Sequence, residues 1–181
     1  MLKRPLLIIA LMSGLATISG CTQPPITYPL APKSVPSASF LKGKADRVVV
    51  NKGARELKLI RGGQVIRTYP IALGPNPVGH KIMEGDGRTP EGAYVLDWRN
   101  PNSRFYRSIH VSYPDPSDRL LASKLGVDPG GMIMVHGEAS YMRFGGGTPR
   151  DWTEGCIAVS NRAMDEIWAL VDDGTPILIN P

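Results

Sequence analysis

Two residues of this sequence, Cys156 and His136, are of types that could carry out nucleophilic catalysis together. A thiolate is a strong nucleophile, but a free cysteine loses its proton only at about pH 8.5, so it needs a base nearby. An imidazole can accept that proton and later donate it to a leaving amine. Gly155, directly before the cysteine, permits a sharp turn that exposes backbone N–H groups to an oxyanion. His136 ends an apolar run and precedes Gly137, so we expect it at a strand end.

Two other interpretations of these residues are open at this point. The pair could be a buried thiol and a hydrogen-bonded structural histidine. A zinc site built from Cys156, His80, His110 and His136 is also conceivable, but no two of these residues have the close spacing typical of zinc ligands. We therefore predict no metal site. His80 lies in the loop before Thr89, where it either lines a cleft or is an ordinary surface residue.

The first twenty residues have the layout of an export signal. A basic start is followed by an apolar run at residues 6–15, which is too short to span a bilayer as a mature helix. Residues 18–21 (Ile-Ser-Gly-Cys) resemble the lipobox of bacterial lipoproteins, in which the cysteine is acylated and the chain is cut before it. Several acyl chains would anchor the protein stably. We predict a lipoprotein signal peptide at residues 1–20 and a lipid on Cys21, against the alternative of a soluble secreted protein.

This prediction places the protein in the bacterial cell envelope, attached to a membrane and facing the periplasm. Thr22 stands where lipoproteins of the inner membrane of enteric bacteria often carry Asp, which favours the outer membrane. A lipid on Cys21 would also leave Cys156 without a disulfide partner. A lone thiol is unusual in an oxidising compartment, and catalysis is one reason to keep it.

A proline-rich stretch separates the signal from the rest of the chain. Residues 21–45 contain five prolines and are expected to form a semi-rigid tether, with the folded domain at residues 46–181. Removing residues 1–20 lowers the net charge from +5 to +3, because this segment has two basic and no acidic residues. Such a mild charge gives no argument for a nucleic-acid partner.

The composition and patterning of the domain predict a mainly β fold with one or two helices. The 181 residues include 20 Gly and 17 Pro, which is typical of a turn-rich, strand-based protein. A Gly-Gly pair between two apolar runs indicates a hairpin. One helix is expected at residues 117–125, capped by Ser117 or Asp118, and a second is capped by Ser160 or Asn161. Strands are expected at residues 48–50, 57–60, 65–73, 94–98, 109–113, 132–135, 157–159 and 177–179.

Three short motifs occur in an order that resembles one enzyme family. They are residues 89–94 (Thr-Pro-Glu-Gly-Ala-Tyr), residues 134–137 (Met-Val-His-Gly) and residues 153–157 (Thr-Glu-Gly-Cys-Ile). Each motif alone is unspecific, but together they resemble the signature of the L,D-transpeptidase catalytic domain of the YkuD type, over residues 46–180. The resemblance implies a β-rich, sandwich-like fold that acts on peptidoglycan stem peptides without a metal or organic cofactor.

The resemblance also implies a role for the residues of these motifs. Cys156 would be the nucleophile and His136 the base and acid, while Gly155 and the Cys156 N–H would hold the oxyanion and Gly137 would support the backbone beside the histidine. In this family the thiol attacks the carbonyl of the diamino acid in a tetrapeptide stem, D-Ala leaves, and a thioester forms. An amine of another stem or of a wall-linked protein, or water, then resolves the thioester.

Two positions depart from the family pattern. Ala158 stands where an arginine is common, and residues 153–154 are Thr-Glu where Ser followed by His or Arg is usual. These departures concern the anchoring of the substrate rather than the nucleophile. A guanidinium suits a stem carboxylate, so other arginines are candidates to replace the missing charge, although each could be a surface residue. The candidates for substrate contacts are Thr153, His80, Arg88, Arg143 and Arg162.

The sequence favours a peptidoglycan L,D-transpeptidase in cell-wall biogenesis or remodelling, with two alternatives. A hydrolase of the same fold, an amidase or endopeptidase, would use water as the acceptor. A non-catalytic wall-binding lipoprotein would keep the fold with an inactive site. If the site is active, we expect Cys156 to react with thiol reagents faster than a free thiol at about pH 6–7.

Overall fold

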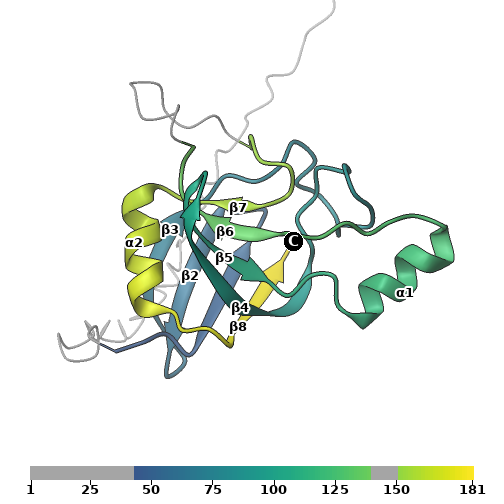
Figure 1. Ribbon diagram of the computed structural model, residues 1–181. Coiled ribbons are helices and arrows are strands. Elements are labelled where there is room, and N and C mark those ends of the chain that lie inside the picture. Colours follow the sequence, from purple (N-terminus) through teal and green to yellow (C-terminus); the bar gives the residue numbers. More distant parts are fainter. Residues whose placement is uncertain (1–42, 140–150) are drawn as a thin grey trace, which may run out of the picture. The chain divides into compact units, whose positions relative to one another are not determined.

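The computed structural model of this protein describes residues 43–139 and 151–181. The predicted signal peptide, Cys21, nearly all of the predicted tether and Arg143 lie outside the described residues. The described part contains eight strands and two helices (Figure 1). Neither of these helices has the length and apolarity needed to cross a bilayer. The elements are β1 (Arg47–Asn51), β2 (Glu56–Arg61), β3 (Gln64–Pro70), β4 (Gly92–Ser103), β5 (Tyr106–Val111), α1 (Pro116–Leu125), β6 (Met134–His136), β7 (Ile157–Ala158), α2 (Asn161–Leu170) and β8 (Thr175–Asn180).

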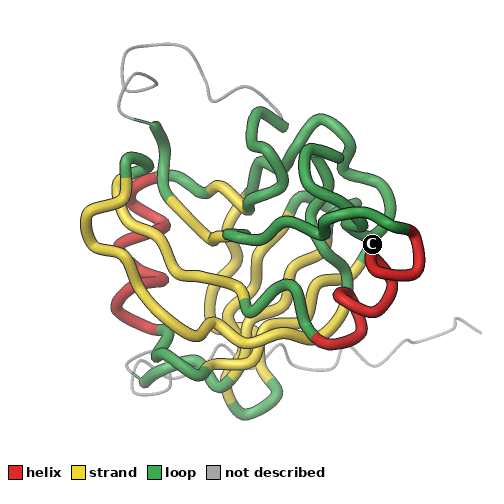
Figure 2. The backbone as a smooth tube through the Cα atoms, turned by 45° about the vertical axis from the view of Figure 1, so that its right-hand side comes forward, coloured by secondary structure: helices red, strands yellow, loops and turns green. Residues whose placement is uncertain are grey.

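The strands of the described part form one curled sheet with the order β3-β2-β1-β8-β4-β5-β6-β7. Neighbours are antiparallel, except that β1 pairs with β8 and β6 pairs with β7 in parallel. Beyond β3, Ala72 exchanges two backbone hydrogen bonds of 2.9 Å with Ala158 of β7, which joins the two ends of the sheet. The strands therefore curve around a common interior, as Figure 2 shows, and few edges stay open. The predicted mainly β, sandwich-like fold is confirmed.

Alternation along the strands builds the core. In β8, Ile177 and Ile179 are buried and Leu178 between them is exposed, while β1 buries Val48 and Val50 on alternate positions in the same way. Met164 of α2 joins this cluster, so α2 covers the sheet (Figure 1). By contrast, α1 buries only two of its residues and extends away from the sheet.

The sequence predicted where the strands lie better than where they end. Each predicted strand overlaps one observed strand, and β4 shows the largest difference because it runs on to Ser103. The predicted hairpin joins β2 to β3. Its Gly62 and Gly63 have φ of +55° and +77°, a combination that glycine adopts without the steric cost of a Cβ.

The two helix starts give one correction and one confirmation. Asp115 caps α1, in place of the predicted Ser117 or Asp118. The Asp115 carboxylate accepts the N–H groups of Ser117 and Asp118, and the Asp118 carboxylate accepts the Asp115 N–H in return. The helix starts earlier than predicted because Pro116 suits the first helical position. Ser160, one of the two predicted residues, caps α2.

Leu96 tests how far the core depends on β4. Its side chain is fully buried, and it pairs with Val111 of β5 and Thr175 of β8. We expect Leu96→Ala to lower the free energy of unfolding by about 2–5 kcal/mol, because the cavity left behind adds to the lost burial. Urea titration measures the change. The matched control Leu120→Ala removes a leucine of α1 that is 57% exposed, and a loss above about 0.5 kcal/mol there would contradict this account of α1.

Candidate active site

His136 and Cys156 lie on neighbouring parts of the sheet although they are far apart in the sequence. In the parallel pair β6–β7, His136 is opposite Ala158 and Val135 is opposite Ile157. Cys156 directly precedes β7, two residues before Ala158, and extended residues two positions apart face the same side of a sheet. With strands about 4.8 Å apart and a rise of about 3.3 Å per residue, the two Cα atoms are separated by roughly 8 Å. The pairing of β6 with β7 thus makes the backbones of His136 and Cys156 neighbours.

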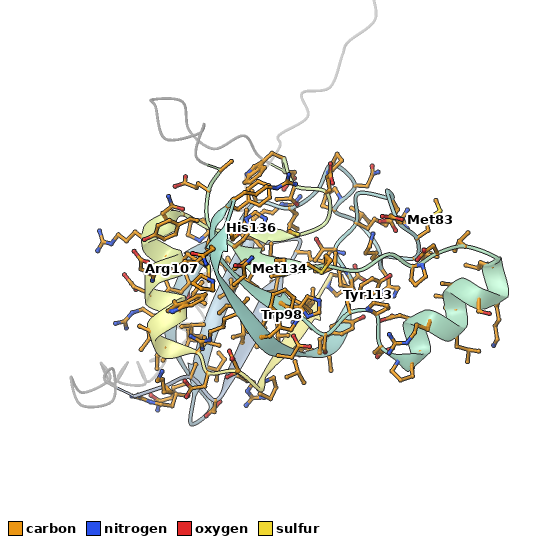
Figure 3. All side chains as sticks on the ribbon, in the orientation of Figure 1. Met83, Trp98, Arg107, Tyr113, Met134 and His136 are labelled. Atoms are coloured by element: carbon orange, nitrogen blue, oxygen red, sulfur yellow. The ribbon has the colours of Figure 1, made fainter. Side chains whose placement is uncertain are left out.

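The imidazole of His136 is held in one orientation. Its Nδ1 lies 2.7 Å from the Gly137 carbonyl oxygen, which assigns the proton to Nδ1 and leaves Nε2 as the proton acceptor. Phe105 stacks on the ring with centroids 4.7 Å apart, and Trp152 meets it edge-on at 5.6 Å. Figure 3 shows His136 where β6 ends, with Met134 on the same strand. The side chain is 2% exposed, so its position is set by packing as well as by hydrogen bonding.

Gly137 has a steric reason to be glycine. A Cβ there would lie 2.5 Å from Asn161 Oδ1 and 3.1 Å from the Phe105 carbonyl oxygen. The same Asn161 Oδ1 accepts the Glu138 N–H at 2.8 Å, which ties the end of β6 to the start of α2. This close packing is consistent with the backbone-supporting role expected for Gly137.

The thiol of Cys156 keeps some accessible surface while most of its surroundings are protein. Its Sγ lies 3.6 Å from the Met132 carbonyl oxygen. Burial raises the pKa of the Cys156 thiol, and the negative charge of Glu154 raises it further. A backbone hydrogen bond at Met134 and the positive charge of Lys81 act in the opposite direction but do not cancel the effect of burial.

The pKa shifts of His136 and Cys156 both favour the uncharged forms of these groups. Burial lowers the pKa of His136, and the hydrogen bond to Gly137 offsets this only in part. A raised thiol pKa and a lowered imidazole pKa both disfavour the thiolate–imidazolium pair near neutral pH. This direction opposes the expectation from the sequence that Cys156 reacts faster than a free thiol at about pH 6–7, because such reactivity requires a thiol pKa below the usual value.

Hydrogen bonds hold the backbone around the thiol in a tight turn. The Thr153 hydroxyl donates to the Cys156 carbonyl oxygen at 2.7 Å and accepts the Gly155 N–H at 3.3 Å. Gly155 has φ of +119°, and a Cβ there would lie 2.5 Å from the Arg88 carbonyl oxygen, so the turn requires glycine. Thr153 is itself buried, and both of these bonds stay within the turn. The structure therefore assigns Thr153 to shaping the turn.

The arginines predicted from the sequence occupy different surroundings. Arg88 is half-buried, its Nη1 donates to the His80 carbonyl oxygen at 3.4 Å, and it lines a cavity of about 420 Å³ together with Met83 and Leu125. This cavity lies beside the loop that supports Gly155 and is not lined by the candidate catalytic pair.

The Arg162 side chain is 92% exposed, with its Nε 3.8 Å from a carboxylate oxygen of Glu166.

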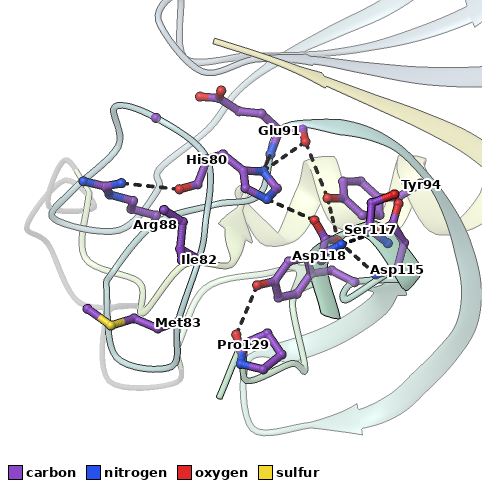
Figure 4. A network of polar contacts seen from close by, with 12 residues as sticks. His80, Ile82, Met83, Arg88, Glu91, Tyr94, Asp115, Ser117, Asp118 and Pro129 are labelled. Atoms are coloured by element: carbon purple, nitrogen blue, oxygen red, sulfur yellow. Dashed lines mark hydrogen bonds and ion pairs between the residues drawn. The ribbon is translucent and has the colours of Figure 1, made fainter. Parts of the chain in front are cut away.

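His80 takes part in a polar network that connects α1 to the segment around Glu91 (Figure 4). Its Nδ1 accepts the Glu91 N–H at 3.0 Å, and its Nε2 lies 3.0 Å from Asp118 Oδ1. The Tyr94 hydroxyl donates to the other Asp118 oxygen at 3.0 Å, and burial raises the pKa of that hydroxyl. The observed contacts of His80 thus join two structural segments.

Three important side chains were not singled out from the sequence. Lys52 is 1% exposed, although a lysine in a turn is ordinarily a surface residue. Arg55 forms a bidentate ion pair with Asp151, in which Nε donates to Oδ1 at 2.9 Å and Nη2 donates to Oδ2 at 2.7 Å. This ion pair holds the chain in place just before Trp152. Phe105, which stacks on His136, carries no pattern that could have identified it.

The structure does not bring the histidines together. His110 Nδ1 lies 2.7 Å from Asp97 Oδ1 and its ring stacks on Trp98, while His80 and His136 have the separate partners described above. Within residues 43–139 and 151–181, no three His, Cys, Asp or Glu side chains lie close enough to hold a metal ion.

Comparison with known proteins connects this geometry to a family. The sequence model of the L,D-transpeptidase catalytic domain (YkuD) matches residues 45–179. YafK of Escherichia coli K12, named for the L,D-transpeptidases, is 30% identical over 111 residues, which are 60% of this chain and 38% of that protein. YkuD of Bacillus licheniformis, named likewise, is 29% identical over 135 residues, covering 75% of this chain and 66% of that protein.

A solved structure has the same fold. The helical cell shape determining protein Pgp2 of Campylobacter jejuni, in its K307A mutant, superimposes with a TM-score of 0.56 and 26% identity, covering 76% of this chain and 47% of that one. The chain thus spans less than half of the length of both Pgp2 and YafK. Because the family match begins just before β1 and extends into β8, it takes in the whole sheet that carries His136 and Cys156, and the chain belongs to the L,D-transpeptidase catalytic domain family.

Proposed function

We propose that this chain is a peptidoglycan L,D-transpeptidase that acts through a thioester on Cys156. The observation that supports the proposal is the parallel pairing of β6 with β7, because β6 ends at His136 and β7 begins directly after Cys156. Membership of the family supports the reaction class. The likeness to a helical cell shape determining protein favours a role in cell-wall remodelling.

The first half of the reaction forms the thioester. As Sγ of Cys156 attacks the carbonyl carbon of the diamino acid in a tetrapeptide stem, Nε2 of His136 takes the thiol proton. The oxyanion that develops is stabilised by the Cys156 N–H at the Gly155 turn. When the intermediate collapses, the carbon–nitrogen bond breaks and the imidazolium returns its proton to the amine of the departing D-Ala.

The second half transfers the acyl group. The amine of another stem attacks the thioester, His136 takes a proton from this amine, and the thiol of Cys156 leaves with that proton. Water attacking at the same point would hydrolyse the stem instead. Both outcomes use the same two residues, so they differ only in which acceptor reaches the thioester.

Substitution of the two residues tests the chemistry. When the protein is incubated with tetrapeptide muropeptides, Cys156→Ala should abolish the covalent adduct seen by intact-mass spectrometry, and His136→Gln should slow its formation by about 10²–10⁴-fold. His110→Gln is the matched control and should retain the activity, because His110 has its own partner in Asp97.

The muropeptide products distinguish the alternatives in the same experiment. New cross-links support the transpeptidase, and loss of existing links without new ones supports the hydrolase. Products that are identical for the wild type and Cys156→Ala would contradict the proposal and point to a non-catalytic wall-binding protein.

The pKa shifts predict a wide pH plateau. The productive form has a neutral imidazole and a neutral thiol. Because burial lowers the pKa of His136 below its ordinary 6.5, activity should fall on acidification only below that pH. Because burial raises the pKa of Cys156 above its usual value, loss of the proton needed by the leaving amine should occur only at a higher pH than for a free thiol. The pH dependence of kcat/KM measures both limbs, and an acid limb centred above 7 would contradict this assignment.

We also propose that a lipid on Cys21 attaches the protein to the outer membrane, facing the periplasm. Support comes from the apolar segment and the lipobox-like residues 18–21. In cells fed an alkyne fatty acid, the wild-type protein should become labelled and move with the outer-membrane fraction. Cys21→Ser should remove the label, whereas Cys156→Ser should keep it. Labelling that survives Cys21→Ser would overturn this proposal.

A further inference from the structure

The ammonium group of Lys52 is buried and fully satisfied. Its Nζ donates to the carbonyl oxygens of Gly79 at 2.6 Å and Thr89 at 3.0 Å, and to Glu91 Oε1 at 2.8 Å. A lysine ammonium has three N–H groups, so each has an acceptor. Moving a charge out of water is unfavourable unless hydrogen-bond partners compensate for the lost hydration. The three acceptors must therefore stay close to Nζ, and this requirement fixes the position of the segments that carry them.

These bonds fix Thr89, which in turn contacts the turn at the thiol. Thr89 is completely buried, and its hydroxyl donates to the Gly155 carbonyl oxygen at 2.8 Å. The carbonyl oxygen of Arg88 also packs against Gly155 so closely that a Cβ would lie 2.5 Å from it. Lys52, Thr89 and Gly155 thus form a continuous chain of hydrogen bonds from the end of β1 to the residue before Cys156.

The Thr89–Gly155 bond fixes a direction as well as a position. A peptide group is planar and trans, so its C=O and N–H point in opposite directions. Holding the Gly155 carbonyl toward Thr89 therefore aims the N–H of Cys156 away from Thr89. That N–H is the group expected to hold the oxyanion.

We propose that Thr89 and Lys52 are positioning residues that aim the Cys156 N–H at the oxyanion. The inference rests on the proposed function, because it assigns a role within the acylation step. Thr89 acts directly on the Gly155 carbonyl, and Lys52 acts through Thr89. Neither touches the reacting atoms.

The test separates the direction of the N–H from the position of the thiol. Alkylation by iodoacetamide reports the thiol alone because it has no oxyanion, whereas acetylation by p-nitrophenyl acetate passes through an oxyanion. Both rates are measured by intact-mass spectrometry for the wild type, Thr89→Val, Thr89→Ser and Lys52→Met. Thr175→Val is the matched control, because Thr175 is also buried and donates its hydroxyl to a backbone carbonyl, that of Asp172 at 2.6 Å.

Thr89→Val should lower the acetylation rate about 10-fold or more while leaving the alkylation rate and its pH profile unchanged. Thr89→Ser should restore acetylation, because it returns the hydroxyl, and Thr175→Val should match the wild type. Lys52→Met should reproduce the pattern of Thr89→Val if it folds. Thr89→Val keeps the shape of the side chain, so the test does not depend on the lysine variant.

Two results would overturn the proposal. Acetylation by Thr89→Val at the wild-type rate would show that the bond does not orient the N–H. An equal loss of alkylation and acetylation would show that Thr89 only maintains the structure. Failure of the proposed function would give a different result: p-nitrophenyl acetate would acetylate the wild type, but a tetrapeptide stem would not acylate it. The acetylation rates of the Thr89 variants would still test the role of Thr89 in that case.

Discussion

The parallel pairing of β6 with β7 is the contact on which the candidate site depends. β7 has only two residues, and it is held between β6 on one side and Ala72 on the other. Parallel strands require a long connection between them, which explains why His136 and Cys156 are remote in the sequence. If β7 shifted by one residue, strand alternation would turn the side chain before it to the other face.

Buried and half-buried polar side chains hold the loops near this pair of strands. The ion pair of Arg55 with Asp151 fastens the segment before the thiol, and Asp151 also accepts the Leu73 N–H at 3.1 Å. Lys52 fastens the segment that contains Thr89. Loops of this kind have no ladder of backbone hydrogen bonds, so a side chain with several donors or acceptors supplies the missing order.

Burial also sets the electrostatic state of the site. Phe105 and Trp152 enclose the imidazole of His136, and the pKa shifts of this ring and of the thiol both favour uncharged groups. In the proposed mechanism, the thiolate therefore forms together with its attack on a bound carbonyl carbon.

The sequence by itself determined the mainly β class and the approximate location of each strand in the described part of the chain, because alternation and turn glycines are local properties. It also predicted Cys156 and His136 as the candidate pair. It also identified Ser160 as a helix cap, but it missed Asp115, since several polar residues compete at that helix start. Only the tertiary structure decided that Lys52 is buried, that Phe105 packs on His136, and that Thr89 holds the Gly155 carbonyl. The physical reason is that burial and hydrogen-bond partners come from segments distant in the chain, which come together only when the strands pair and the sheet closes.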